Sequence, residues 1–304
     1  MEKLGEMLKH IIVPLVTPFT RDTQEIDFKA TEKLIEHLIS KNYCDSILVA
    51  GTTGEFNTLL YDERIELFKF VKKIVAGRRP LVAGTGAAST KETASLTKKA
   101  EELRYDAAMV VAPYYCKPTQ EGIYMHFKTI AQSTSLPIML YNIPLFTGVN
   151  IDPPTVGRLA EIKNILGIKD EAGINPTQMT EYARATPDHF TIYNGDDIMV
   201  LCGMVQGAAG VVSGGSHMIG DKMRKMIELF LAGKVKEAEK IHKDLDPLFK
   251  SWSPIGGVNP IPGLKAAIEL MGIQVGPPRL PLVESTKEEK ELIKEQLMRL
   301  GLFN

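Results

Sequence analysis

The chain has 304 residues, of which 44% are hydrophobic and 24% are charged, and its formal net charge is -1. This composition is typical of a globular protein with a large core, either one α/β barrel or two smaller domains. The balanced charge argues against a nucleic-acid partner or an anionic membrane surface, and no stretch approaches the roughly 20 apolar residues of a membrane span.

The three cysteines, Cys44, Cys116 and Cys202, are far apart and form no C-x-x-C pair. Their distribution argues against a disulfide framework and a zinc ribbon, and it favours a reducing compartment. The six histidines show no H-E-x-x-H pairing, so we expect no metal site. The first apolar run is six residues long and is broken by Pro14, unlike a signal peptide. We therefore expect a cytoplasmic protein.

Eight apolar runs with strand character recur along the chain, and amphipathic segments separate them. The expected strands are 11–19, 46–51, 80–86, 107–113, 137–144, 165–170, 190–197 and 207–215. The expected helices between the first six are 27–41, 62–76, 90–103, 120–133 and 153–162. Asp27, Asp62 and Ser89 are placed to cap the first three helices, and Pro153–Pro154 suits the first turn of the fifth.

This alternation predicts a (β/α)₈ TIM barrel; a doubly wound open sheet is the alternative. Only helical patterns follow the eighth strand, at 217–232, 235–250, 259–272 and 286–300. Pro/Gly stretches at 253–263 and 276–281 separate the later ones. We predict that residues 1–225 form the barrel with the active site. Residues 226–304 then form a C-terminal helical segment packed on the barrel.

Lys169 stands at the end of the sixth expected strand, in the sequence ILGIKDE. A lysine there has its aliphatic chain in the core and its amine at the carboxyl end of the strand, where burial lowers the pKa of the ammonium. A neutral amine can attack a carbonyl and form a Schiff base. The alternative is a structural lysine that extends to the surface or pairs with Asp170 or Glu171.

Other reactive groups follow the strands at the same end of the predicted barrel. Thr52 and Thr53 lie in the turn GTTG after strand two, which offers hydroxyls and backbone N–H groups to a small anion. Tyr115 follows strand four and Tyr141 ends strand five. A phenol can both donate and accept a proton, as Schiff-base chemistry requires.

Six motifs together resemble the dihydrodipicolinate synthase / N-acetylneuraminate lyase family of Schiff-base aldolases. They are GTTGE (51–55), PYYCKPTQEG (113–122), YNIP (141–144), GIKDEAG (167–173), NGDD (194–197) and NPIP (259–262). The resemblance runs from VTPF at 16–19 over nearly the whole chain. It implies a carbon–carbon lyase that needs no cofactor, acts on pyruvate or another 2-oxo acid plus an aldehyde, and forms a homotetramer built as a dimer of dimers.

The resemblance also implies roles for individual residues. Lys169 would carry the Schiff base. Tyr141 would relay protons, helped by Thr53 and by Tyr115 from a neighbouring subunit. The carboxylate of the 2-oxo acid would be held by Thr52 and Thr53, and the pocket near the lysine would be lined by Gly195 and Val212.

Phe146 departs from the pattern of the lysine-pathway synthases, which usually have an arginine two residues after YNxP. A neutral ring cannot form a bidentate ion pair with a carboxylate. Two substrate readings therefore remain open: condensation of pyruvate with an aldehyde, as in dihydrodipicolinate synthase, and cleavage of a 2-keto-3-deoxy sugar acid, as in gluconate-type aldolases or N-acetylneuraminate lyase. Less favoured are a sugar-acid dehydratase and a protein that binds 2-oxo acids without turnover.

Overall fold

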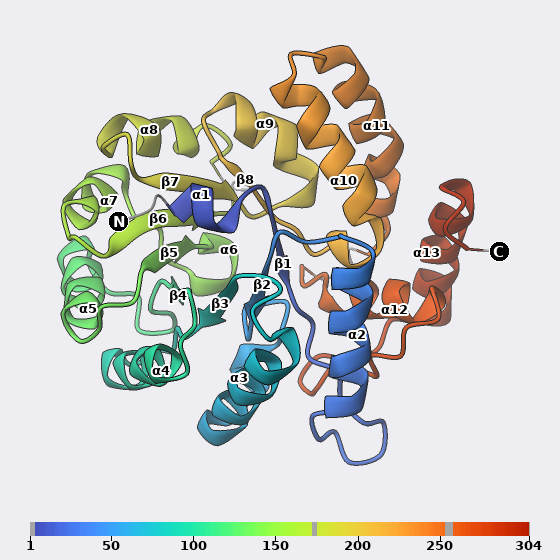
Figure 1. The fold of residues 1–304 in the computed structure, drawn as a ribbon, viewed down its shortest axis with the longest axis horizontal. Coiled ribbons are helices and arrows are strands. Elements are labelled where there is room, and N and C mark those ends of the chain that lie inside the picture. The colour runs from blue at the N-terminus through green and yellow to red at the C-terminus, as the bar shows by residue number, and fades with distance from the viewer. Residues whose placement is uncertain (1–3, 172–174, 253–257, 304) are drawn as a thin grey trace.

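A closed barrel of eight parallel strands forms the centre of the molecule (Figure 1). The computed structural model describes residues 4–171, 175–252 and 258–303. The strands are β1 (Ile11–Pro14), β2 (Ser46–Val49), β3 (Leu81–Gly84), β4 (Ala107–Val111), β5 (Ile138–Asn142), β6 (Ile165–Asp170), β7 (Thr191–Asn194) and β8 (Gly210–Val212). Since β1 pairs with both β2 and β8, the sheet closes on itself. The predicted TIM barrel is confirmed, and each strand lies within one of the eight expected runs.

Helices surround the barrel (Figure 1). They are α2 (Phe28–Ser40), α3 (Tyr61–Val75), α4 (Thr90–Glu102), α5 (Gln120–Gln132), α7 (Pro153–Ala160), α8 (Gln178–Ala185), α9 (Val200–Val205) and α10 (Ser216–Leu231). Two short helices, α1 (Leu4–Leu8) and α6 (Pro144–Thr147), and two 3₁₀ turns, η1 (Phe56–Thr58) and η2 (Asp197–Met199), complete this part. The sequence analysis did not identify α1, α6, α8 or α9, which have four to eight residues and so make at most about two helical turns. The equally short α7 was expected, and it begins at Pro153–Pro154.

Most of the expected caps are present. The side chains of Asp27 and Ser89 accept hydrogen bonds from backbone N–H groups in the first turns of α2 and α4. The prediction for Asp62 is wrong, because α3 begins one residue earlier, at Tyr61. Glu63 accepts a hydrogen bond from the backbone N–H of Leu60 instead, at 2.7 Å.

The helix α1 covers the end of the barrel opposite Lys169. Leu4 and Leu8 are fully buried and belong to the cluster of side chains inside the barrel. The N–H of Gly5 donates to the hydroxyl of Thr191, the first residue of β7. This closes the amino ends of the strands, so the open mouth is at their carboxyl ends. No helix among the described residues is both long enough and apolar enough to cross a membrane.

The C-terminal helices lie together on one side of the barrel, in orange and red in Figure 1. They are α11 (Val235–Ser251), α12 (Ile261–Leu270) and α13 (Lys287–Arg299). Residue 225, where we expect the barrel to end, lies within α10, and this division of the chain stays a prediction. Residues 172–173 of the GIKDEAG motif and 253–257 of the Pro/Gly stretch lie outside the described residues.

A buried ion pair joins α12 to the loop after β2. The Nζ of Lys265 lies 2.5 Å from Oε1 of Glu55, and the two residues are 1% and 0% exposed. Glu55 adopts a left-handed backbone conformation, with φ 56° and ψ 37°, at the end of the GTTGE turn. Its other oxygen accepts the backbone N–H of Arg279 at 2.8 Å. The C-terminal segment therefore holds in place the turn that contains Thr52 and Thr53.

Removing one partner of this pair should destabilise the fold strongly. We expect Lys265→Met to lower the free energy of unfolding by about 3–5 kcal/mol, because it leaves the Glu55 carboxylate buried without its counter-ion. The double variant Lys265→Met/Glu55→Gln should recover part of this loss. Chemical denaturation checks the result. Lys236→Met, which breaks an exposed pair with Glu239, is the control and should cost about 1 kcal/mol or less.

Candidate active site

An irregularity in strand pairing turns Lys169 toward the inside of the barrel. The register between β5 and β6 shifts between Ile138 and Met139, so that Met139 lies opposite Gly167 rather than Leu166. Leu166 packs inside the barrel, and strict alternation from it would put Lys169 on the outer face. The extra residue of the bulge reverses this parity. Lys169 thus pairs in register with Tyr141 on one side and Tyr193 on the other.

Lys169 is buried, with 5% of its surface exposed, and has two close polar neighbours. Its Nζ lies 3.4 Å from Oε2 of Glu171 and 4.1 Å from the centre of the Tyr141 ring. Burial alone lowers the pKa of the Lys169 ammonium, but Tyr141 and Glu171 together outweigh it and leave the pKa above its usual value. The sequence-based expectation of a lowered pKa is therefore wrong. A raised pKa favours the charged form of the amine, which becomes a nucleophile only after a neighbouring group takes its proton.

Tyr141 connects Lys169 to the loop after β2. Burial raises the pKa of the Tyr141 phenol, and the Lys169 ammonium opposes part of that rise. The Oγ1 of Thr52 donates a hydrogen bond to the phenol oxygen at 3.3 Å. A buried, protonated phenol between an amine and a hydroxyl can receive one proton and release another.

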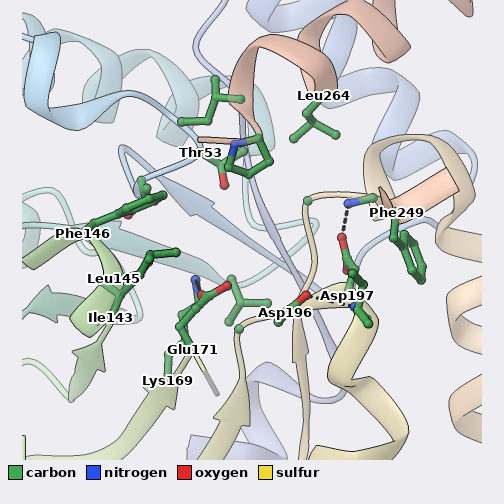
Figure 2. A pocket seen from close by; sticks show the side chains of 18 of the residues that line it. Thr53, Ile143, Leu145, Phe146, Lys169, Glu171, Asp196, Asp197, Phe249 and Leu264 are labelled. Atoms are coloured by element: carbon green, nitrogen blue, oxygen red, sulfur yellow. Dashed lines mark hydrogen bonds and ion pairs between the residues drawn. The ribbon is translucent and has the colours of Figure 1, made fainter. Parts of the chain in front are cut away.

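Three carboxylates line the pocket that contains Lys169, and Figure 2 shows Glu171 directly beside Lys169, with Asp196 and Asp197 on the side opposite Phe146. Burial raises the pKa of Glu171 to about 7 and that of Asp197 to about 6; the ammonium of Lys169 opposes both shifts, and Asp196 adds to both. Burial also raises the pKa of Asp196. Near neutral pH, Glu171 can thus either accept or donate a proton.

Asp170 points away from this group. It is 1% exposed, and its Oδ1 accepts a hydrogen bond from Asn142 at 2.9 Å and a longer one from Gln178 at 3.4 Å. Of the two acidic neighbours that could pair with Lys169, the structure selects Glu171. Lys169 does pair with an acidic neighbour in sequence, which was the alternative to a reactive lysine, but this pair lies inside the pocket rather than at the protein surface.

The pocket draws on strand ends, loops and the C-terminal helices. Its lining includes seven of the residues predicted from sequence: Thr52, Thr53, Tyr141, Phe146, Lys169, Gly195 and Val212. It also includes residues that the sequence analysis did not identify: Ile143, Leu145, Ile198, Gly214, Phe249, Trp252, Val258, Ile261 and Leu264, together with the carboxylates of Glu171, Asp196 and Asp197. The motifs NGDD and NPIP contain Asp196, Asp197 and Ile261, but neither motif indicated that α11 and α12 form part of the wall.

Tyr115 is the one predicted site residue that lies outside the pocket of its own chain. It is 94% exposed, and its backbone φ is +71°. Its neighbour Tyr114 instead contacts Phe56, with ring centres 6.1 Å apart, and lines a second cavity beside Thr52 and Phe146. Within one chain, Tyr115 is therefore in no position to act on Lys169.

The fold and the site together define a class of protein. A TIM barrel with a buried lysine, a phenol and a hydroxyl at the carboxyl ends of its strands has the groups of a lysine Schiff-base enzyme. Across residues 4–171, 175–252 and 258–303, no three His, Cys, Asp or Glu side chains gather so as to hold a metal ion. The chemistry available to the described residues is that of an amine, hydroxyls and carboxylates.

Comparisons with known proteins identify the family. The model of the dihydrodipicolinate synthetase family matches residues 7–300. The 4-hydroxy-tetrahydrodipicolinate synthase of Desulforudis audaxviator is 46% identical over 96% of this chain and 98% of its own, and that of Oceanobacillus iheyensis is 45% identical over 94% and 95%. The crystal structure of dihydrodipicolinate synthase from Cyanidioschyzon merolae with lysine bound superposes with a TM-score of 0.93, at 42% identity over 98% of this chain and 99% of its own.

The chain belongs to the dihydrodipicolinate synthetase family. Its expected class, a carbon–carbon lyase of the Schiff-base type, is confirmed by this membership.

Because Gly195 has no side chain, Lys169 and Glu171 can occupy the space beside it. A Cβ at position 195 would collide with Cε of Lys169 and lie 2.5 Å from Oε2 of Glu171. We expect Gly195→Ala to slow covalent trapping of a 2-oxo acid at least about tenfold, because a misplacement of 1 Å can cost roughly 10²-fold. The rate of trapping by borohydride measures this. The thermal midpoint should stay nearly unchanged, and an unaltered trapping rate would show that the lysine tolerates the displacement.

Proposed function

We propose that the protein joins pyruvate, or a related 2-oxo acid, to an aldehyde through a Schiff base on Lys169. The observation that carries the proposal is the placement of the Lys169 amine beside the Tyr141 phenol, with Glu171 at 3.4 Å and the Thr52 hydroxyl on the phenol. The names of the relatives support it, since synthases of 4-hydroxy-tetrahydrodipicolinate are about 45% identical to this chain.

Formation of the Schiff base begins with loss of a proton from the Lys169 ammonium. Glu171 is the nearest carboxylate that can receive it. The amine then forms a bond to C2 of the 2-oxo acid, and the carbonyl oxygen takes up a proton through Tyr141. Loss of that oxygen as water leaves the protonated imine, so the two protons that leave nitrogen depart with the water.

The carboxylate of the 2-oxo acid would lie against the turn that contains Thr52 and Thr53. Both residues line the pocket, and the turn combines hydroxyls with backbone N–H groups. Gly195 and Val212 would border the reacting carbon, where little side-chain volume intrudes. These assignments follow the family pattern residue by residue.

Bond formation follows transfer of a proton from C3 to Glu171, the carboxylate that lies 3.4 Å from the Lys169 nitrogen. The electron pair of that C–H bond forms a C2–C3 double bond, and the imine electrons return to nitrogen as a neutral enamine. C3 then attacks the aldehyde carbon, the nitrogen becomes a protonated imine again, and the aldehyde oxygen takes up the proton that left C3. Water adds to C2 of this imine, and the C2–N bond breaks to release the 2-oxo acid product and the Lys169 ammonium. Run backwards, the same steps would cleave a 2-keto-3-deoxy sugar acid. That second candidate is favoured by Phe146, a neutral ring in the pocket wall.

We further propose a cytoplasmic homotetramer in which Tyr115 completes the site of a neighbouring subunit. The near-complete exposure of Tyr115 supports this, as does the second cavity beside Thr52 and Phe146, which an aromatic side chain of a second copy could fill. The cytoplasmic assignment is supported by Cys44, Cys116 and Cys202, all of which are free thiols.

Borohydride reduction in the presence of pyruvate tests the Schiff base directly. We expect one reduced pyruvate per chain, attached to Lys169, as identified by peptide mass spectrometry. Lys169→Arg should fold and show no adduct, because a guanidinium stays protonated at any working pH. Lys163→Arg, on the exposed surface just before β6, is the matched control and should trap like the parent protein. An adduct on another lysine would refute the role of Lys169, and the absence of any adduct would favour a binding protein.

Tyr141→Phe should slow Schiff-base formation by roughly 10²–10⁴-fold, the usual size of a general acid–base contribution. Pyruvate should still bind, since the Thr52–Thr53 turn remains. Rapid-mixing trapping measures the rate. Tyr193→Phe provides a control on the opposite flank of Lys169, because its hydroxyl donates to the carbonyl of Lys9 at the closed end of the barrel. Equal rates in Tyr141→Phe and the parent protein would remove the phenol from the mechanism.

A further inference from the structure

Strands β5 and β6 end in two successive register pairs that face opposite sides of the barrel wall. Tyr141 pairs with Lys169 inside the barrel, and Asn142 pairs with Asp170 one residue further on. Because side chains alternate along a strand, Asn142 and Asp170 point outward, toward the surrounding helices. They are 0% and 1% exposed. The proposed mechanism uses the inner pair only, so it gives no role to the buried carboxylate that follows the reactive lysine.

The side chain of Asn142 holds the far end of the segment that follows β5. This segment comprises residues 143–151, and we call it the β5 loop. The Oδ1 of Asn142 accepts the backbone N–H of Ile151 at 2.9 Å. Its Nδ2 donates to Oδ1 of Asn150, also at 2.9 Å. Since Asn142 is also the residue from which the loop starts, its position determines where the loop closes.

The β5 loop supplies the apolar wall of the pocket. Ile143, Leu145 and Phe146 line the pocket, and Figure 2 shows them on one side of it. Within the loop, the hydroxyl of Thr147 donates to the carbonyl of Ile143 at 2.9 Å, which ties the short helix α6 to the start of the loop. The placement of the loop therefore sets how far this wall lies from Lys169.

Asp170 anchors Asn142 to the strand that carries Lys169. Its Oδ1 accepts a hydrogen bond from Nδ2 of Asn142 at 2.9 Å and a longer one from Nε2 of Gln178 at 3.4 Å. Burial raises the pKa of the Asp170 carboxyl to about 6, and these two donors oppose part of the rise. The carboxyl is thus ionised at neutral pH, and its hydrogen bonds are charge-assisted. Because the buried Oδ2 has no partner among the described residues, the anchor in this part of the chain is Oδ1.

Helix α8 supports the end of the β5 loop from outside the barrel. Gln178 exchanges two hydrogen bonds with Asn150, since its Nε2 donates at 3.0 Å and its Oε1 accepts at 2.9 Å. The same Nε2 donates to the hydroxyl of Tyr182 at 2.8 Å, and that hydroxyl donates to the carbonyl of Ile151 at 2.6 Å. Buried amides and hydroxyls are costly when unpaired, so the network favours one position of the loop end.

We propose that Asp170 is a positioning residue, which holds the β5 loop through Asn142 and thereby fixes the apolar wall relative to Lys169. This rests on the proposed function and deepens it. Formation of the Schiff base involves the amine, Tyr141 and Glu171 but not this wall. Addition of the aldehyde does involve the wall, because C3 must meet the aldehyde carbon in the correct geometry, and a displacement of 1 Å can cost roughly 10²-fold. Loss of the anchor should therefore slow only the second step.

Two quantities measured on the same variants test this separation. One is the rate of borohydride trapping of pyruvate on Lys169. The other is kcat/KM for the aldehyde at saturating pyruvate, with L-aspartate semialdehyde and glyceraldehyde as the probes. We expect Asp170→Ala to lower kcat/KM at least about tenfold and to change the trapping rate by less than about threefold. Asp170→Asn should keep both within about threefold, because an amide oxygen can accept the same hydrogen bonds.

A double-mutant cycle tests the hydrogen bond itself. Asn142→Ala removes the other partner and should have the same selective effect as Asp170→Ala. The double variant should be no more than about threefold worse than the more affected single variant, whereas independent tenfold effects would multiply to about 100-fold. Asp188→Asn, in the exposed turn before β7, is the control and should leave both quantities unchanged.

Hydrogen exchange reports on the β5 loop without any aldehyde. Asp170→Ala should speed amide exchange in a peptide that spans residues 143–151 at least about fivefold and leave a peptide from α7 unchanged. Should Asp170→Ala fail to fold, Asn142→Ala gives the same measurements from the other partner of the bond.

The outcomes separate this proposal from the proposed function. A parent protein that forms no adduct with pyruvate refutes the proposed function, while hydrogen exchange still tests the anchor. If the adduct forms, equal losses in trapping rate and in kcat/KM overturn the positioning role, and so does unchanged exchange in the β5 loop. An Asp170→Asn variant as impaired as Asp170→Ala, or effects that multiply in the double variant, overturns the bond to Asn142 as its basis.

Discussion

The pairing of the Lys169 ammonium with Glu171 and Tyr141 is the interaction on which the site depends. A buried charge at the end of β6 would be costly alone, and these two neighbours make it tolerable. The same two groups are the partners that we propose for proton transfer to and from the amine. The fold contributes by bringing the carboxyl ends of all eight strands to one mouth, so that residues far apart in sequence surround a single amine.

Most of the barrel could be predicted because its signals are local. Apolar runs, caps such as Asp27, and helical periods depend on neighbours in the chain, and every observed strand lies inside an expected run. The position of the site could be predicted as well. Once the barrel is inferred, its reactive side chains are expected at the carboxyl ends of the strands. Thus Lys169, Tyr141 and Thr52, which line one pocket, could all be placed at the mouth of the barrel from sequence.

The features that could not be predicted depend on how neighbouring strands pair and on contacts between residues far apart in the chain. The bulge opposite Met139, which turns Lys169 inward, arises from the pairing of β5 with β6. Neither strand's sequence predicts it alone. The direction of the Lys169 pKa shift depends on where Glu171 points, which its position two residues along the chain does not determine. The contributions of Phe249, Trp252 and Leu264 to the wall arise from helices that follow the barrel strands and pack back over its mouth.

The ion pair between Glu55 and Lys265 also bears on how the protein is made. Glu55 belongs to the second βα unit, whereas Lys265 and Arg279, which contact its carboxylate, are more than 200 positions later in the chain. During synthesis from the amino terminus, the strands of the barrel leave the ribosome well before these partners do. Until Lys265 has emerged, the turn that contains Thr52 and Thr53 has a carboxylate without its cation. The nascent chain should therefore acquire its reactive site only near the end of translation, even if the strands of its barrel have paired earlier.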